Sequence, residues 1–127
     1  MRKLRFVLLM IMVFPLCLQS QPGTKPVIVQ VDLDVVVHPV SADYVRSGLT
    51  HAKDIGARAV IIRINTPGGL LESMRDMVGA ILDSDVPVIT WVGPNGSRAA
   101  SAGFFILLAG DVAAMAPGTN SVASKSI

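Results

Sequence analysis

Two short segments of this 127-residue chain have residue types suited to acyl transfer. The first, 65–69, reads Asn-Thr-Pro-Gly-Gly, and its glycines can turn backbone N–H groups toward a substrate because no Cβ stands in the way. The second, 96–103, carries Ser101 among small residues that leave room for a substrate carbonyl. A serine hydroxyl can attack a carbonyl, and fixed N–H donors stabilise the oxyanion that forms. The pattern therefore predicts a nucleophile, Ser101, and an oxyanion hole at Gly68 and Gly69.

Each segment taken alone also fits a purely structural role. The Pro-Gly-Gly turn can be a tight connection, and the small residues around Ser101 can form a close-packing helix surface. A phosphate-binding loop is a weaker alternative, because the segment lacks a Gly-Lys-Ser/Thr ending and spaced Gly-x-Gly-x-x-Gly glycines. The pair of segments favours a reactive site, since an acyl-transfer site needs the nucleophile and its donors about 3 Å from one carbonyl oxygen. Neighbouring parallel strands would bring the two segments side by side.

The elements around these segments predict an α/β domain with a mainly parallel sheet and crossover helices. Strands are expected where β-branched residues cluster between turn-forming residues, and helices where apolar residues recur at helical spacing. Ser41 is expected to cap the first helix. The nearly continuous apolar character of 59–64 indicates helices on both faces of the sheet. The expected strands are 27–31, 35–37, 59–64, 87–92 and 112–115, and the expected helices are 42–53, 70–84 and 99–109.

Residues 1–20 predict a signal peptide or, alternatively, an uncleaved N-terminal membrane anchor. Three basic residues stand among the first five positions, and thirteen uncharged residues follow over Phe6–Leu18. This apolar core is short for a spanning helix, which needs roughly 20 apolar residues, and Pro15 interrupts it. Residues 21–26 are expected to be a linker and residues 27–127 the folded domain. Under either alternative the domain is expected outside the cytoplasm.

Composition and charge exclude several function classes. Hydrophobic residues make up 51% of the chain and charged residues 16%, which is too apolar for a disordered protein. The net charge of +2 does not suggest a nucleic-acid partner. The only cysteine, Cys17, lies in the leader, so the folded part has no internal disulfide or thiolate metal site. Asp32 and Asp34 alternate at a strand end without the further ligands that a metal needs, and no cofactor is expected.

Three motifs in order resemble one protein family. Asn-Thr-Pro-Gly-Gly at 65–69, Ala-Ala-Ser-Ala-Gly at 99–103 and Ala-Met-Ala-Pro-Gly-Thr-Asn at 114–120 are similar to motifs of the NfeD-type membrane-bound serine proteases of the ClpP class. The resemblance implies a ClpP/crotonase-like fold with Ser101 as the nucleophile. It implies oxyanion donors at the Gly68-Gly69 turn and at the N–H of Ala102.

The same resemblance implies a biological setting. It implies a homo-oligomer that associates with the membrane on its extracytoplasmic side, periplasmic or extracellular. The expected substrates are hydrophobic segments of membrane-associated, stomatin-like proteins.

The sequence offers few candidates for the general base that would activate Ser101. The family uses a serine–lysine dyad, and the resemblance puts its lysine past Ile127, which implies that the chain holds only the N-terminal portion of the domain. Lys125 is the only lysine after Ser101, and such a tail residue is usually a solvated charge. His38 is expected in a turn and His51 on a helix surface. The alternatives are a catalytically inactive fragment that keeps the fold and subunit contacts, and a crotonase-like acyl-CoA enzyme.

Overall fold

The structure, a computed structural model, describes residues 23–122. The predictions for residues 1–20 and for Lys125 lie outside this range. Among the described residues, no helix has the length and apolar character to cross a membrane.

Four parallel strands form the main sheet, in the order β1-β2-β3-β5. The register places Val60 of β2 beside Val29 of β1 and Val88 of β3. Each strand is joined to the next by a helix, which a parallel pair requires. The predicted α/β class with a parallel sheet is therefore confirmed. The strands are β1 (Ile28–Leu33), β2 (Ala59–Ile64), β3 (Val88–Val92) and β5 (Val112–Met115).

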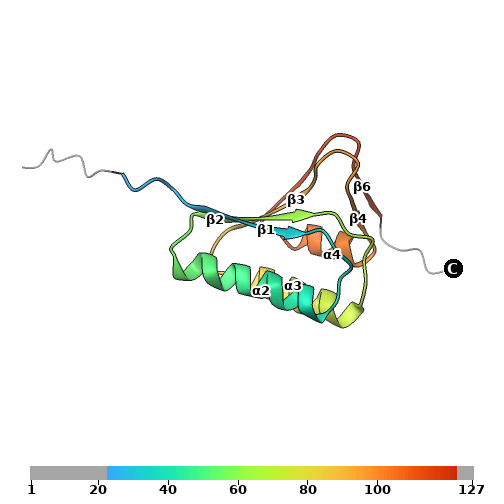
Figure 1. Cartoon of the computed structure of the whole chain (residues 1–127), viewed down its shortest axis with the longest axis horizontal. Coiled ribbons are helices and arrows are strands. Elements are labelled where there is room, and N and C mark those ends of the chain that lie inside the picture. Colours follow the sequence, from blue (N-terminus) through green and yellow to red (C-terminus); the bar gives the residue numbers. More distant parts are fainter. Residues whose placement is uncertain (1–22, 123–127) are drawn as a thin grey trace, which may run out of the picture.

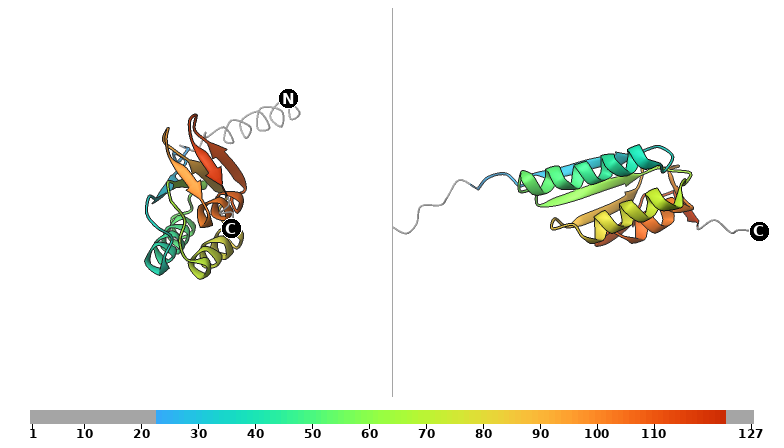
Figure 2. Two further views of the ribbon diagram at one scale, coloured as in Figure 1. Left: turned by 90° about the vertical axis from the view of Figure 1, so that its right-hand side faces the viewer. Right: turned by 90° about the horizontal axis from the view of Figure 1, so that it is seen from below.

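The crossover helices are α2 (Pro39–Asp54), α3 (Leu71–Leu82) and α4 (Ala102–Leu108). Figure 1 shows α2 and α3 on the same side of the sheet, and Figure 2 shows α4 beside α3. Within residues 23–122 all three helices lie on one face of the sheet, so the expectation of helices on both faces is wrong for this part of the chain. In β2 only alternate residues are fully buried, whereas the residues between them are covered in part. The continuous apolar run in β2 is therefore compatible with a sheet that is fully buried on one face only.

The hydrophobic core lies between the sheet and the helices. Its largest fully buried side chains are Leu33, Ile62, Ile64, Met77 and Ile106, which come from two strands and two helices. Burying a side chain of this size contributes about 1.5–3 kcal/mol. This packing fixes the strand ends on which the predicted site depends.

The first helix, α2, begins earlier than the sequence predicted. Its N-cap is His38, not Ser41, and Pro39 takes the first helical position, where a fixed φ and a missing N–H are favourable. The Ser41 amide donates to Nδ1 of His38, and the His38 amide donates to the Ser41 hydroxyl. Ser41 is thus the third residue of a reciprocal capping box. His38 caps the helix in place of the turn that was expected.

The expected helix over 99–109 divides into two elements. A short strand, β4 (Arg98–Ala100), comes first and α4 follows, with Ser101 between them. A strand that was not predicted, β6 (Asn120–Val122), pairs in parallel with β4. The expected strand at 35–37 is reduced to one bridge between Val37 and Gly69.

Candidate active site

The glycine turn after β2 is held by backbone pairing with the segment after β1. The Val37 amide donates to the Gly68 carbonyl at 2.8 Å, and the Leu70 amide donates to the Val37 carbonyl at 2.8 Å. Gly69 lies between these bonds, with φ of 156°. A methyl group on Gly69 would collide with the Val37 carbonyl oxygen and approach the Val37 nitrogen to 2.7 Å. This contact between backbones requires glycine at position 69.

Ser101 lies at a sharp bend between β4 and α4. Its φ of 53° and ψ of −115° make it the one non-glycine residue with positive φ in the described part of the chain. Such a conformation costs about 1–3 kcal/mol, and strained residues of this kind cluster at functional sites. The Ser101 amide donates to the Val122 carbonyl of β6 at 2.8 Å, which helps to hold the bend. The serine of a nucleophile elbow sits on a similarly strained turn between a strand and a helix.

The structure brings the glycine turn and Ser101 into contact. A methyl group on Gly68 would lie 2.7 Å from Cβ of Ser101, 2.9 Å from the Ala100 carbonyl oxygen and 3.3 Å from the Ala102 amide nitrogen. These distances leave no room for a side chain at position 68. Three of the predicted site residues, Gly68, Ser101 and Ala102, are therefore neighbours in space, with Gly69 next in the chain.

The predicted oxyanion donors differ in what their amides already bond. The Gly68 amide donates to the Thr66 hydroxyl at 3.2 Å. Within residues 23–122, the amides of Gly69 and Ala102 have no protein acceptor. In the parallel bridge, the N–H and C=O of Gly69 point away from Val37, because the bonds to Val37 use the residues on either side. Gly69 and Ala102 thus have the amides that a substrate oxygen can use.

Two parts of this arrangement were missed from the sequence. Thr66 is completely buried beneath the turn, although a threonine before proline resembles an ordinary loop residue. The strand β6 holds the Ser101 amide through Val122. The Gly-Thr-Asn motif at 118–120 could have indicated β6. The Asn120 amide donates to the Ser97 carbonyl, where the pairing with β4 begins.

Neither histidine of the chain is bonded to Ser101. His38 caps α2 through Ser41, and His51 is exposed in the last turn of the same helix. Lys125 falls outside the described residues. The part of the chain that the structure describes therefore supplies no general base hydrogen-bonded to the Ser101 hydroxyl.

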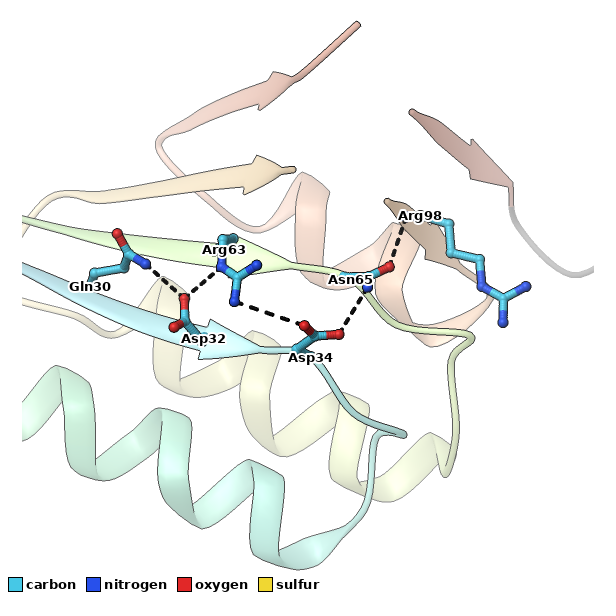
Figure 3. A network of polar contacts seen from close by, with 6 residues as sticks. All are labelled: Gln30, Asp32, Asp34, Arg63, Asn65 and Arg98. Carbon is cyan, nitrogen blue, oxygen red and sulfur yellow. Dashed lines mark hydrogen bonds and ion pairs between the residues drawn. The ribbon is translucent and has the colours of Figure 1, made fainter. Parts of the chain in front are cut away.

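A polar network connects the outer surface of the sheet to the start of β4 (Figure 3). Arg63 of β2 donates to Asp32 at 2.8 Å and lies 3.8 Å from Asp34. The Asn65 side chain donates to Asp34 at 2.8 Å and accepts from the Arg98 amide at 3.2 Å. Asn65 thereby ties the end of β1 to the strand that leads into Ser101. Among residues 23–122, no three His, Cys, Asp or Glu side chains are grouped as a metal would need.

The Asp32–Arg63 pair makes stability depend on pH. The hydrogen bond from Arg63 lowers the pKa of Asp32, so its stabilising effect is complete above the pKa of an unfolded aspartate and is lost as pH falls through the lower folded pKa. Asp32→Asn is expected to cost about 0.5 kcal/mol near pH 7, because the pair is partly exposed to solvent, and less near pH 2.5, as the pH falls toward the lowered pKa of Asp32. Urea denaturation at both pH values measures this difference. Asp76→Asn is the matched control, since Asp76 has no ion pair among the described residues, and an equal effect of both variants at pH 7 would contradict the prediction.

A groove of about 490 Å³ between α2 and α3 is a separate feature. Charged residues from both helices line it, among them Arg46, Lys53 and Asp76. It contains none of the predicted site residues, so it supports no assignment of the site.

Comparison with known families identifies the chain. The family model described as the NfeD1b N-terminal domain matches residues 27–127. The chain belongs to this family. The resemblance drawn from the three motifs is thereby confirmed.

Two curated relatives of this NfeD1b-type domain are membrane proteins. The membrane-bound protease PH1510 of Pyrococcus horikoshii is 44% identical over 79 residues, which are 62% of this chain and 18% of that protein. The membrane protein NfeD1b of Bacillus subtilis is 44% identical over 77 residues, which are 61% of this chain and 17% of that protein. The chain thus spans less than a fifth of the length of either relative.

Solved structures confirm the ClpP-like fold of the domain. A 1510-N membrane protease specific for a stomatin homolog, from Pyrococcus horikoshii, superposes with a TM-score of 0.75 at 35% identity, covering 81% of this chain and 52% of that one. A ClpP1 variant from Listeria monocytogenes gives a TM-score of 0.65 at 24% identity, covering 71% of this chain and 52% of that one. The second likeness shows the fold alone.

Proposed function

We propose that this chain is the N-terminal portion of the serine endopeptidase domain of a membrane-associated protease. Ser101 attacks the scissile carbonyl, and the Gly68-Gly69 turn and Ala102 surround the oxyanion. The observation that carries the proposal is the contact between the turn and a strained Ser101. The relatives named as proteases support the reaction class.

The proposed reaction proceeds by acyl transfer. The Ser101 oxygen adds to the carbonyl carbon of the peptide bond, and the carbonyl oxygen becomes an oxyanion that accepts from the amides of Gly69 and Ala102. Each such donor contributes about 10²–10³ in rate. The tetrahedral intermediate expels the amine and leaves an acyl-serine, which water then hydrolyses. A lysine expected beyond Ile127 accepts the serine proton and passes it to the leaving amine.

The surroundings of the turn support a hydrophobic substrate. Val35 and Val36 lie in the segment that pairs with the turn, and Leu70 and Leu71 follow the turn in the chain. Each of the four is 49–57% exposed. Within residues 23–122 no amide donates to the Gly69 carbonyl, so this carbonyl can accept an N–H from an extended peptide while the Gly69 amide holds the oxyanion. We therefore propose hydrophobic segments of stomatin-like, membrane-associated proteins as substrates, in line with the stomatin-specific relative. The proposed setting is a homo-oligomer at the extracytoplasmic side of a membrane.

Labelling with an activated fluorophosphonate tests the proposal. All labelling experiments use the chain extended through the expected lysine, because the described residues supply no base for Ser101. We expect a single adduct, located on Ser101 by tandem mass spectrometry. A peptide with an apolar stretch should slow the labelling, whereas a matched peptide with serine in place of the apolar residues should not. Equal protection by both peptides would contradict the substrate class but leave the reaction class intact.

The second candidate function is a catalytically inactive domain that keeps the fold and its subunit contacts. It is favoured by the lack of a general base bonded to Ser101 within residues 23–122. A chain that gives a native spectrum but takes up no probe at Ser101 would favour this second candidate.

A further inference from the structure

Thr66, which lies between the glycine turn and β2, is bonded to both sides of the turn. Its side chain is completely buried. The Thr66 hydroxyl donates to the Val35 carbonyl at 2.6 Å and accepts from the Gly68 amide at 3.2 Å. One hydroxyl thus bonds a carbonyl of the segment after β1 and the first amide of the glycine turn.

The backbone and methyl group of Thr66 contact the other half of the site. The Thr66 amide donates to the Arg98 carbonyl at 2.7 Å, and the Thr66 carbonyl accepts from the Ala100 amide at 3.1 Å. The methyl group lies where a side chain of Gly103 would be, because a Cβ built there would stand 2.6 Å from it. Thr66 therefore contacts the residues on both sides of Ser101.

Through these contacts Thr66 sets the distance between the glycine turn and the residues around Ser101. We propose that Thr66 is a positioning residue that holds the Gly68-Gly69 turn against Ser101. Its hydroxyl also accepts the hydrogen bond of the Gly68 amide. The amides of Gly69 and Ala102 are then the donors that remain for the substrate oxygen. The positioning role rests on the proposed acyl transfer, whereas the contacts themselves do not.

Two matched pairs of variants isolate the hydroxyl. Thr66→Val keeps a branched side chain and removes the hydroxyl, and the unchanged threonine is its reference. Thr66→Ser keeps the hydroxyl, and Thr66→Ala differs from it by that group alone. In both pairs, losing the hydroxyl leaves the Val35 carbonyl and the Gly68 amide without their partner. The second pair decides the question if the valine variant does not fold.

The first readout is the rate of fluorophosphonate labelling, separated into binding and the chemical step. A shift of about 1 Å between nucleophile and donors can cost up to about a hundredfold, so the maximal labelling rate should fall by roughly tenfold or more in Thr66→Val. The probe concentration for half-maximal rate should change little, and Thr66→Ser should label nearly as fast as the unchanged chain. Equal maximal rates with and without the hydroxyl, in folded proteins, would overturn the positioning role.

The second readout is amide hydrogen exchange at Gly68, which needs no reactivity. The Gly68 amide should lose protection in the variants without the hydroxyl and keep it in Thr66→Ser. Unchanged protection would overturn the inference whatever the labelling shows. If the unchanged chain takes up no probe, the proposed function fails and the positioning role with it, whereas a labelled chain with no difference between variants excludes only the role of Thr66.

Discussion

Replacing Gly69 with alanine is expected to destabilise the domain by about 3 kcal/mol, near the upper end for overpacking substitutions. The added methyl would collide with the carbonyl oxygen of Val37 and come within 2.8 Å of its carbonyl carbon. These are backbone atoms, so no side-chain rotation can relieve the contact. The change would break the bridge that fixes the glycine turn.

Gly79→Ala is the matched control for this prediction. Gly79 lies inside α3, and a methyl group there meets no atom within 4 Å. Alanine in a helix is favoured over glycine, so this variant should gain about 0.5–1 kcal/mol. Since 1 kcal/mol shifts the melting temperature of such a domain by about 4–8 °C, calorimetry should show a fall of more than about 10 °C for Gly69→Ala and a small rise for Gly79→Ala. Equal melting of the Gly69 variant and the unchanged chain would show that the turn is not packed as described.

Removing the Ser101 hydroxyl is expected to have the largest effect on reactivity. Ser101→Ala and Ser101→Gly both delete the proposed nucleophile, so fluorophosphonate labelling should fall by at least about 10³-fold. The two variants should differ in stability. Alanine keeps the strain of the positive φ, whereas glycine relieves it and should gain about 1 kcal/mol after the entropy of the unfolded chain is counted.

Urea denaturation of the two Ser101 variants measures the strain separately from the chemistry. A glycine variant no more stable than the alanine variant would show that Ser101 stores little strain. Labelling that persists in the alanine variant would show that another residue reacts with the probe.

Local pattern predicted the main elements because each of them satisfies its own hydrophobic period. The bounds of β2 agree with the sequence prediction, since an apolar run between polar residues leaves little choice. The strand β4 was missed because its pairing partners, Thr66 and β6, are distant in the sequence. The alanines at 99 and 100 favour a helix by local propensity, and only the long-range pairing holds them in an extended strand. The start of α2 was missed because Pro39 outweighs the cap assigned to Ser41.

The sequence predicted which segments meet at the candidate site, but not which of their amides are available to a substrate. Adjacent parallel strands predicted that the glycine turn and the serine segment would meet, and Gly68 does contact Ser101. Which amides remain free could not be predicted, because the Thr66 hydroxyl occupies the Gly68 amide only in the folded chain. Spacing along the sequence carries no information about such a buried contact.

A crystal structure of the extended chain after reaction with a fluorophosphonate would locate the nucleophile and the oxyanion donors in one experiment. The phosphorus should be bonded to Oγ of Ser101, and its phosphoryl oxygen should lie within about 3 Å of the amide nitrogens of Gly69 and Ala102, the distance of an oxyanion hole. An adduct whose phosphoryl oxygen points into solvent, away from both amides, would show that Gly69 and Ala102 do not form the oxyanion hole.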